Sequence, residues 1–241
     1  MPAPTTLADP LSFEPPVPDE GLDLAIRHEE LVLHTQPRSA AAEQYRRLRS
    51  SLVALNPDGA PRTIMLTSAV EGEGKTVATL NLALALAERP RSRILVVDAD
   101  LRSPGVEHYL GLPRRQGLSE VLDNQLALDQ AIRKTAARGL DIIAAGGSPD
   151  RPRSLNVDRM RSLLHQLKQR YDYVLLDSPP AYVLTDPSVL GAATDGIVIV
   201  VRLRTTERHL VEETQRLLET TGGNVLGVCV LGADGPRGGR G

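Results

Sequence analysis

The residues best suited to chemistry lie in a short loop at positions 68–76, which reads SAVEGEGKT. It follows the apolar run IMLTS, and Gly72 and Gly74 allow its backbone to curl so that successive N–H groups point inward. A helix beginning directly after the loop would direct its positive end to the same point. Lys75 would neutralise phosphate oxygens there, and the Thr76 hydroxyl suits Mg²⁺. The pattern predicts a site for ATP with magnesium.

The same loop has the spacing A/G-x-x-x-x-G-K-S/T of the P-loop, or Walker A, motif. A chance match is disfavoured because the chain has only three lysines, Lys75, Lys134 and Lys168. We expect the nucleotide to contact these residues of the loop and of the helix start: Ala69, Glu71, Gly72, Glu73, Gly74, Lys75, Thr76 and Val77.

Two further apolar runs end in carboxylates. The run ILVVD at 94–98 continues as ADLR, so Asp98 and Asp100 would lie at the carboxyl edge of a parallel sheet, where such sheets bind ligands. One carboxylate could hold Mg²⁺ and the other could orient or deprotonate an attacking hydroxyl. Taken alone, the segment fits a plain turn equally well, since Asp is common after strands.

The run YVLLD at 173–177 places Asp177 as a Walker B acid for the magnesium. Such a run is ordinary by itself, but three sites in the expected order support one another. We therefore expect catalytic roles for Lys75, Asp98 and Asp100, and metal binding by Thr76, Asp98 and Asp177.

Short apolar runs alternate with amphipathic stretches along most of the chain. Strands are expected at 64–68, 94–98, 140–145, 173–177, 197–201 and 224–231, and helices at 76–88, 118–134, 155–170 and 206–221. This alternation implies a parallel sheet joined by right-handed crossovers. The predicted fold is a three-layer α/β P-loop NTPase with a mostly parallel sheet flanked by helices on both faces.

The N-terminal region has a different composition. Residues 1–28 are rich in proline and acids and hold few large apolar groups, so we expect a disordered tail; the alternative is an extended arm in which residues 31–33 form a short strand. Ser39 should cap a helix that ends at Asn56-Pro57-Asp58-Gly59. One P-loop domain is expected over 29–233, followed by a flexible glycine-rich C-terminus at 234–241.

The composition argues against several classes of protein. The net charge of −2 and the pI of about 6.2 provide no general basic field, so we expect no nucleic-acid partner. The single cysteine, Cys229, lies in an apolar run and fits a reducing cytoplasm. No apolar stretch approaches the roughly 18 residues of a spanning helix, and the start lacks leader features. A cytoplasmic protein is expected.

Taken together, SAVEGEGKT, ILVVDADLR and YVLLDSPP resemble the Walker A, A′ and B motifs of the bacterial tyrosine kinases (BY-kinases), within the MinD/ParA-like P-loop ATPases. The resemblance spans about residues 30–233. Glu43, Arg46 and Arg49 match the E-x-x-R-x-x-R signature that the family uses for ring-like self-association. By themselves they would indicate a solvated helix face with ion pairs worth roughly 0.2–0.5 kcal/mol each.

The resemblance implies ATP- and Mg²⁺-dependent phosphorylation of protein tyrosine, usually between neighbouring subunits, in the control of capsular and exopolysaccharide biosynthesis and export. It also implies a transmembrane co-polymerase that activates the kinase and recruits it to the inner face of the plasma membrane.

The chain departs from the family pattern in three places. No tyrosine follows Tyr182, whereas the family usually ends in a tyrosine cluster; Gly232 replaces an asparagine that contacts adenine; and Glu71 stands where proline is frequent. Two alternatives stay open. One is a MinD/ParA-like ATPase switch, although that class carries a signature lysine where this chain has Val70. The other is a nucleotide-gated scaffold without kinase activity.

Overall fold

The computed structural model describes residues 28–60, 62–147, 156–182 and 186–232. The predicted tail, except for residue 28, and the predicted flexible C-terminus lie outside the described residues. Among the described residues, every helix is too short or too polar to cross a lipid bilayer.

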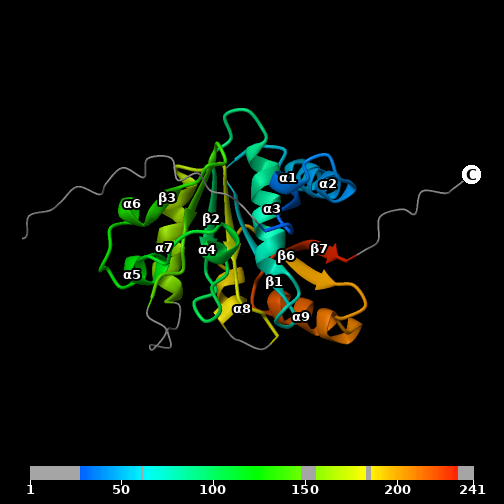
Figure 1. The fold of residues 1–241 in the computed structure, drawn as a ribbon. Coiled ribbons are helices and arrows are strands. Elements are labelled where there is room, and N and C mark those ends of the chain that lie inside the picture. The colour runs from blue at the N-terminus through cyan, green and yellow to red at the C-terminus, as the bar shows by residue number, and fades with distance from the viewer. Residues whose placement is uncertain (1–27, 61, 148–155, 183–185, 233–241) are drawn as a thin grey trace, which may run out of the picture.

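Within the described residues, seven strands form one sheet in the order β3-β4-β2-β5-β1-β6-β7 (Figure 1). Their bounds are β1 Arg62–Ser68, β2 Ile94–Asp98, β3 Ile132–Lys134, β4 Leu140–Ile143, β5 Tyr173–Asp177, β6 Gly196–Arg202 and β7 Val225–Leu231. All neighbouring pairs are parallel except β3 with β4. The predicted mostly parallel sheet is therefore confirmed.

The helices are α1 Val32–Thr35, α2 Ala40–Ala54, α3 Lys75–Ala87, α4 Val106–Tyr109, α5 Leu118–Leu122, α6 Leu128–Ala131, α7 Val157–Lys168, α8 Asp186–Gly191 and α9 Arg208–Thr220. The Ser39 hydroxyl accepts the N–H of Ala42 at 3.1 Å and so caps α2 as predicted. Figure 1 shows α1 and α2 beside α3, which itself packs on β1, β2 and β5.

The core consists of two apolar layers, because successive side chains of a strand point to opposite faces of the sheet. On β1, Ile64 and Leu66 pack with the side chains of α2 and α3, whereas Met65 packs with those of α7, α8 and α9. Both faces of the sheet are thus covered, and the three-layer prediction is confirmed.

One local prediction and one of the alternatives were wrong. The helix expected at 118–134 is divided into α5, α6 and β3. The Glu120 carboxylate accepts the N–H groups of Gly117 and Gly147 at 2.8 and 3.0 Å, and Asn124, with φ of 57°, turns the chain after α5. The alternative strand at 31–33 is also absent, since Val32–Thr35 form the helical turn α1.

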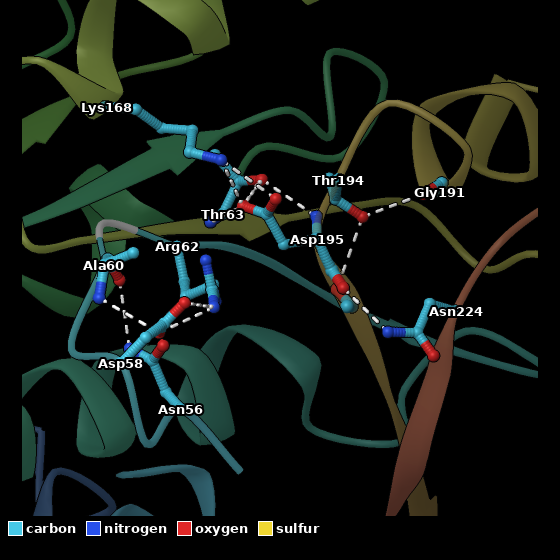
Figure 2. A network of polar contacts seen from close by, with 11 residues as sticks. Asn56, Asp58, Ala60, Arg62, Thr63, Lys168, Gly191, Thr194, Asp195 and Asn224 are labelled. Atoms are coloured by element: carbon cyan, nitrogen blue, oxygen red, sulfur yellow. Dashed lines mark hydrogen bonds and ion pairs between the residues drawn. The ribbon is translucent and has the colours of Figure 1, made fainter.

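A polar network joins elements at the amino-terminal edge of the sheet (Figure 2). The Asp195 carboxylate accepts the N–H and hydroxyl of Thr63 at 2.7 and 2.8 Å and the Nζ of Lys168 at 2.9 Å. Burial alone would raise the pKa of Asp195, but the bonds from Lys168 and Thr63 outweigh it and hold the pKa below its usual value. This carboxylate fastens β1, β6 and α7 together.

Candidate active site

The loop at 68–76 leaves β1 and enters α3 directly. Gly74 is the residue before α3 and has φ of 88°, and Gly72 has φ of 77°. Both values lie in the left-handed region that favours glycine, which explains the two glycines predicted to shape the loop. No side chain caps the start of α3. The N–H groups of its first turn therefore suit an anion such as phosphate.

The Glu73 side chain is buried and engaged within the protein. It is 1% exposed, and its carboxylate accepts the N–H of Val70 at 3.2 Å and the hydroxyl of Thr206. It braces the loop against the segment before α9, so any contact with a nucleotide comes from its backbone. The sequence gives no signal for this role.

The predicted acids lie together at the carboxyl edge of the sheet. Asp98 and Asp177 are register partners on β2 and β5, and both are almost fully buried. The Thr76 hydroxyl donates to Asp177 at 2.6 Å. Lys75, also buried, lies in the same helical turn as Thr76. The structure thus brings the Walker A and Walker B residues and the first A′ acid into one cluster.

The A′ loop folds around its own carboxylates. Asp98 accepts the N–H groups of Gly105 and Val106 at 3.1 and 3.0 Å and that of Asp100 at 3.2 Å. Asp100, 6% exposed, accepts the N–H of Ser103 at 2.9 Å. The acids of DADLR therefore shape a turn at the carboxyl edge of the sheet.

Burial strongly affects the charge of this cluster. Burial, followed by repulsion from Asp177, raises the pKa of Asp98 well above its usual value. Burial also raises the pKa of Asp177 to about 7, against the opposing effects of the Thr76 hydrogen bond and the Lys75 charge. A divalent cation here would offset the repulsion between the acids.

The donor set fits Mg²⁺, since carboxylate and hydroxyl oxygens are the hard ligands that this ion prefers. Among the described residues, no three His, Cys, Asp or Glu side chains are grouped as a metal site. Nucleotide phosphates and water would complete the coordination, as in other P-loop proteins.

Gly105 is a site residue that the sequence pattern did not identify. A Cβ atom placed on it would lie 2.9 Å from Oγ1 and 3.1 Å from Cγ2 of Thr76. The backbone of the A′ loop therefore approaches the P-loop so closely that only glycine fits without a shift.

The proposed base region is an open cavity of about 590 Å³ beside α3, lined by Val77, Arg202 and Gly232 among others. Gly232 has φ of 77° and offers no side chain for reading the edge of a base. Where the family pattern has asparagine, the backbone and neighbouring side chains would have to contact adenine.

The signature arginines of α2 have partners within the chain. Arg46 and Arg49 bind Glu88, which follows α3, at 2.6 and 3.0 Å, and Arg49 also donates to the carbonyl of Ala85 at 2.9 Å. Glu43 lies 3.7 Å from Arg46 and is more exposed than either arginine. The arginines thus join α2 to α3.

Comparison with known proteins places this site in a family. The model of the AAA domain matches residues 61–221. The tyrosine-protein kinase YwqD of Bacillus subtilis is 32% identical over 203 residues, which cover 84% of this chain and 85% of that protein. The kinase domain of the Escherichia coli tyrosine kinase ETK is 29% identical, with a TM-score of 0.78 and coverage of 85% and 82%.

MinD of Pyrococcus horikoshii, solved with Mg-ADP, is a more distant match. It is 26% identical with a TM-score of 0.59, and the match covers 70% of this chain and 69% of MinD. The shared fold is that of a nucleotide-binding ATPase, but both the identity and the structural overlap are higher with the kinases. The chain belongs to the bacterial tyrosine-protein kinases, a family within the MinD-like P-loop ATPases.

Proposed function

We propose that this chain is an ATP-dependent protein-tyrosine kinase that acts in capsular or exopolysaccharide biosynthesis. The proposal is supported mainly by one observation: Thr76, Asp177 and Asp98 meet at the sheet edge, next to an uncapped helix start that carries Lys75. This is the arrangement needed to hold a magnesium-bound triphosphate and to present an acceptor hydroxyl to it.

Each residue has a separate task. The loop N–H groups and Lys75 would bind the phosphates, and Lys75 would stabilise the negative charge that grows on the transferred phosphoryl group. Thr76 and Asp177 would hold Mg²⁺, which when bound neutralises phosphate charge. Asp98 and Asp100, fixed by backbone N–H groups, would orient the tyrosine hydroxyl and accept its proton.

The switch ATPases are less well supported. Val70 stands where those proteins carry their signature lysine, and its N–H is held by Glu73. The match to MinD supports only the shared fold and nucleotide chemistry.

The partner assignments extend the same proposal. We infer that a transmembrane co-polymerase activates the chain at the inner face of the plasma membrane, and that Glu43, Arg46 and Arg49 contribute to a ring-like homo-oligomer. The exposure of Glu43, whose side chain is 54% accessible, leaves it available to a second subunit.

The test is a transfer assay with the purified chain, Mg·ATP and a cytoplasmic fragment of the membrane partner, followed by detection of phosphotyrosine by mass spectrometry. Phosphotyrosine on either protein supports the kinase. ATP hydrolysis without phosphotyrosine supports the switch, and tight nucleotide binding without turnover supports the scaffold. The Lys75→Met variant is the matched control.

A further inference from the structure

A second cavity, of about 620 Å³, opens at the opposite edge of the sheet from the P-loop. It lies between the end of α2, the segment that joins α3 to β2, and the start of β5. Its lining includes Val53, Asn56, Leu86, Arg89, Arg91 and Tyr173. The volume lies within the roughly 300–1,000 Å³ typical of small-molecule sites.

Asn56 is the most unusual residue of this lining because it is only 7% exposed and hydrogen-bond partners are present for just one of the two polar groups of its amide. Its Nδ2 donates to the carbonyl of Ala60 at 3.0 Å and to the hydroxyl oxygen of Tyr173 at 3.2 Å; Figure 2 shows it beside Ala60. A carbonyl can only accept, so the orientation of the amide is fixed. Its Oδ1 is buried without a hydrogen-bond partner in the described part of the chain.

Tyr173 offers the complementary group. Its hydroxyl oxygen accepts from Asn56, and its side chain is 6% exposed. No acceptor for the hydroxyl proton lies among the described residues. Because Asn56 Oδ1 has almost no accessible surface, the lining offers a ligand only the unpaired proton of the Tyr173 hydroxyl, which Asn56 orients. This donor suits an oxygen of a ligand hydroxyl group.

Two exposed arginines, Arg89 and Arg91, belong to the lining of the cavity. The side chains of Arg89 and Arg91 form no hydrogen bond or ion pair with any described residue. The one carboxylate in the lining, Asp172, is already engaged by the backbone N–H of Arg93 at 2.8 Å and by its guanidinium at 3.3 Å. Two free guanidinium groups next to a hydroxyl-binding wall favour an anion.

We propose that this cavity binds a small anion that carries hydroxyl groups, such as a sugar phosphate, with the anionic group at Arg89 and Arg91 and a ligand hydroxyl oxygen accepting the proton of Tyr173. The site is separate from the P-loop and does not depend on kinase activity. It would let the chain respond to a metabolite while a nucleotide occupies the other edge of the sheet.

The test is calorimetry on the full chain with glucose 6-phosphate as the probe, in saturating Mg·ADP so that the P-loop is filled. The same titration is run on Lys75→Met, so that binding of glucose 6-phosphate can be judged even if the nucleotide does not bind. We expect glucose 6-phosphate to bind at least about tenfold more tightly than glucose or inorganic phosphate alone, because each lacks one half of the ligand.

Variants then locate the site. Arg89→Ala combined with Arg91→Gly should weaken binding about fivefold, and Arg91→Gly adds no strain because Arg91 has φ of 65°. Tyr173→Phe, which removes only the hydroxyl group, should weaken it about tenfold. Arg47→Ala, at an exposed position of α2 outside the cavity, should have no effect. No heat with glucose 6-phosphate, equal binding of glucose, or full affinity in the arginine variant would overturn the proposal. If Tyr173→Phe does not fold, the arginine variant decides.

Discussion

Replacing Gly105 with alanine should weaken magnesium-dependent chemistry without unfolding the protein. The new Cβ would lie 2.9 Å from the Thr76 hydroxyl oxygen and 3.1 Å from its methyl carbon. Gly105 has φ of −120°, which alanine also adopts, so any effect comes from the contact and not from backbone strain.

The size of the effect follows from the contact distance. Comfortable separation is about 3.5 Å, so the Thr76 side chain or the A′ loop must move by about 0.5 Å. Thr76 is bonded to Asp177, and Mg²⁺ demands near-ideal octahedral geometry. A misplacement of about 1 Å can cost roughly a hundredfold in rate. We therefore expect about a tenfold loss in kcat and about 1 kcal/mol of lost stability.

The assay measures phosphotyrosine formation together with ATP binding in the presence and absence of Mg²⁺. Affinity for metal-free ATP should stay the same, whereas affinity for Mg·ATP and kcat should both fall. Adding Thr76→Ser removes the methyl group at 3.1 Å and should restore part of the loss. Unchanged kcat in Gly105→Ala, or equal losses with and without Mg²⁺, would refute this reasoning.

Three further predictions concern charged side chains. Lys75→Met should abolish phosphoryl transfer, since such a charge commonly supplies several kcal/mol of transition-state stabilisation; near-wild-type transfer of radiolabel from ATP would contradict this. Asp195→Asn should lower the free energy of unfolding by about 2 kcal/mol at pH 7. Because the pKa of Asp195 is lowered in the folded state, the extra stability of the wild type over Asp195→Asn should persist above a pH of about 4 and be lost as the pH falls through the folded-state pKa. A stability difference that is unchanged at pH 2 in urea titrations would contradict the assignment. Glu88→Ala should cost about 1 kcal/mol of stability by releasing Arg46 and Arg49, yet leave the sedimenting mass intact. If Glu88→Ala lowers that mass as fully as Arg46→Ala combined with Arg49→Ala, the arginines act within the chain and not between subunits.

The sheet and the site were predictable because their signals are local. Each buried strand is a short apolar run, and Asp98 and Asp177 come at the ends of such runs. Parallel strands bring their carboxyl ends to one edge, so adjacency of the acids follows from the fold class.

The remaining features depend on contacts between distant residues. Glu73 and Thr206 are 133 positions apart, and the approach of Gly105 to Thr76 requires the folded A′ loop. The helix expected at 118–134 failed for a similar reason, because Glu120 bonds to Gly147 and Asn124 adopts a left-handed conformation. The spacing of apolar residues that predicted one helix here belongs instead to separate short elements, each of which packs on its own.

The central claim is that the P-loop and the edge carboxylates together bind a magnesium nucleotide. Calorimetry of purified wild-type protein with ATP, first with Mg²⁺ and then with a chelator, tests it most directly. One ATP should bind per chain, with affinity that falls when Mg²⁺ is removed and that loses this dependence in Asp177→Asn. Absence of any magnesium-dependent association of ATP would contradict the account.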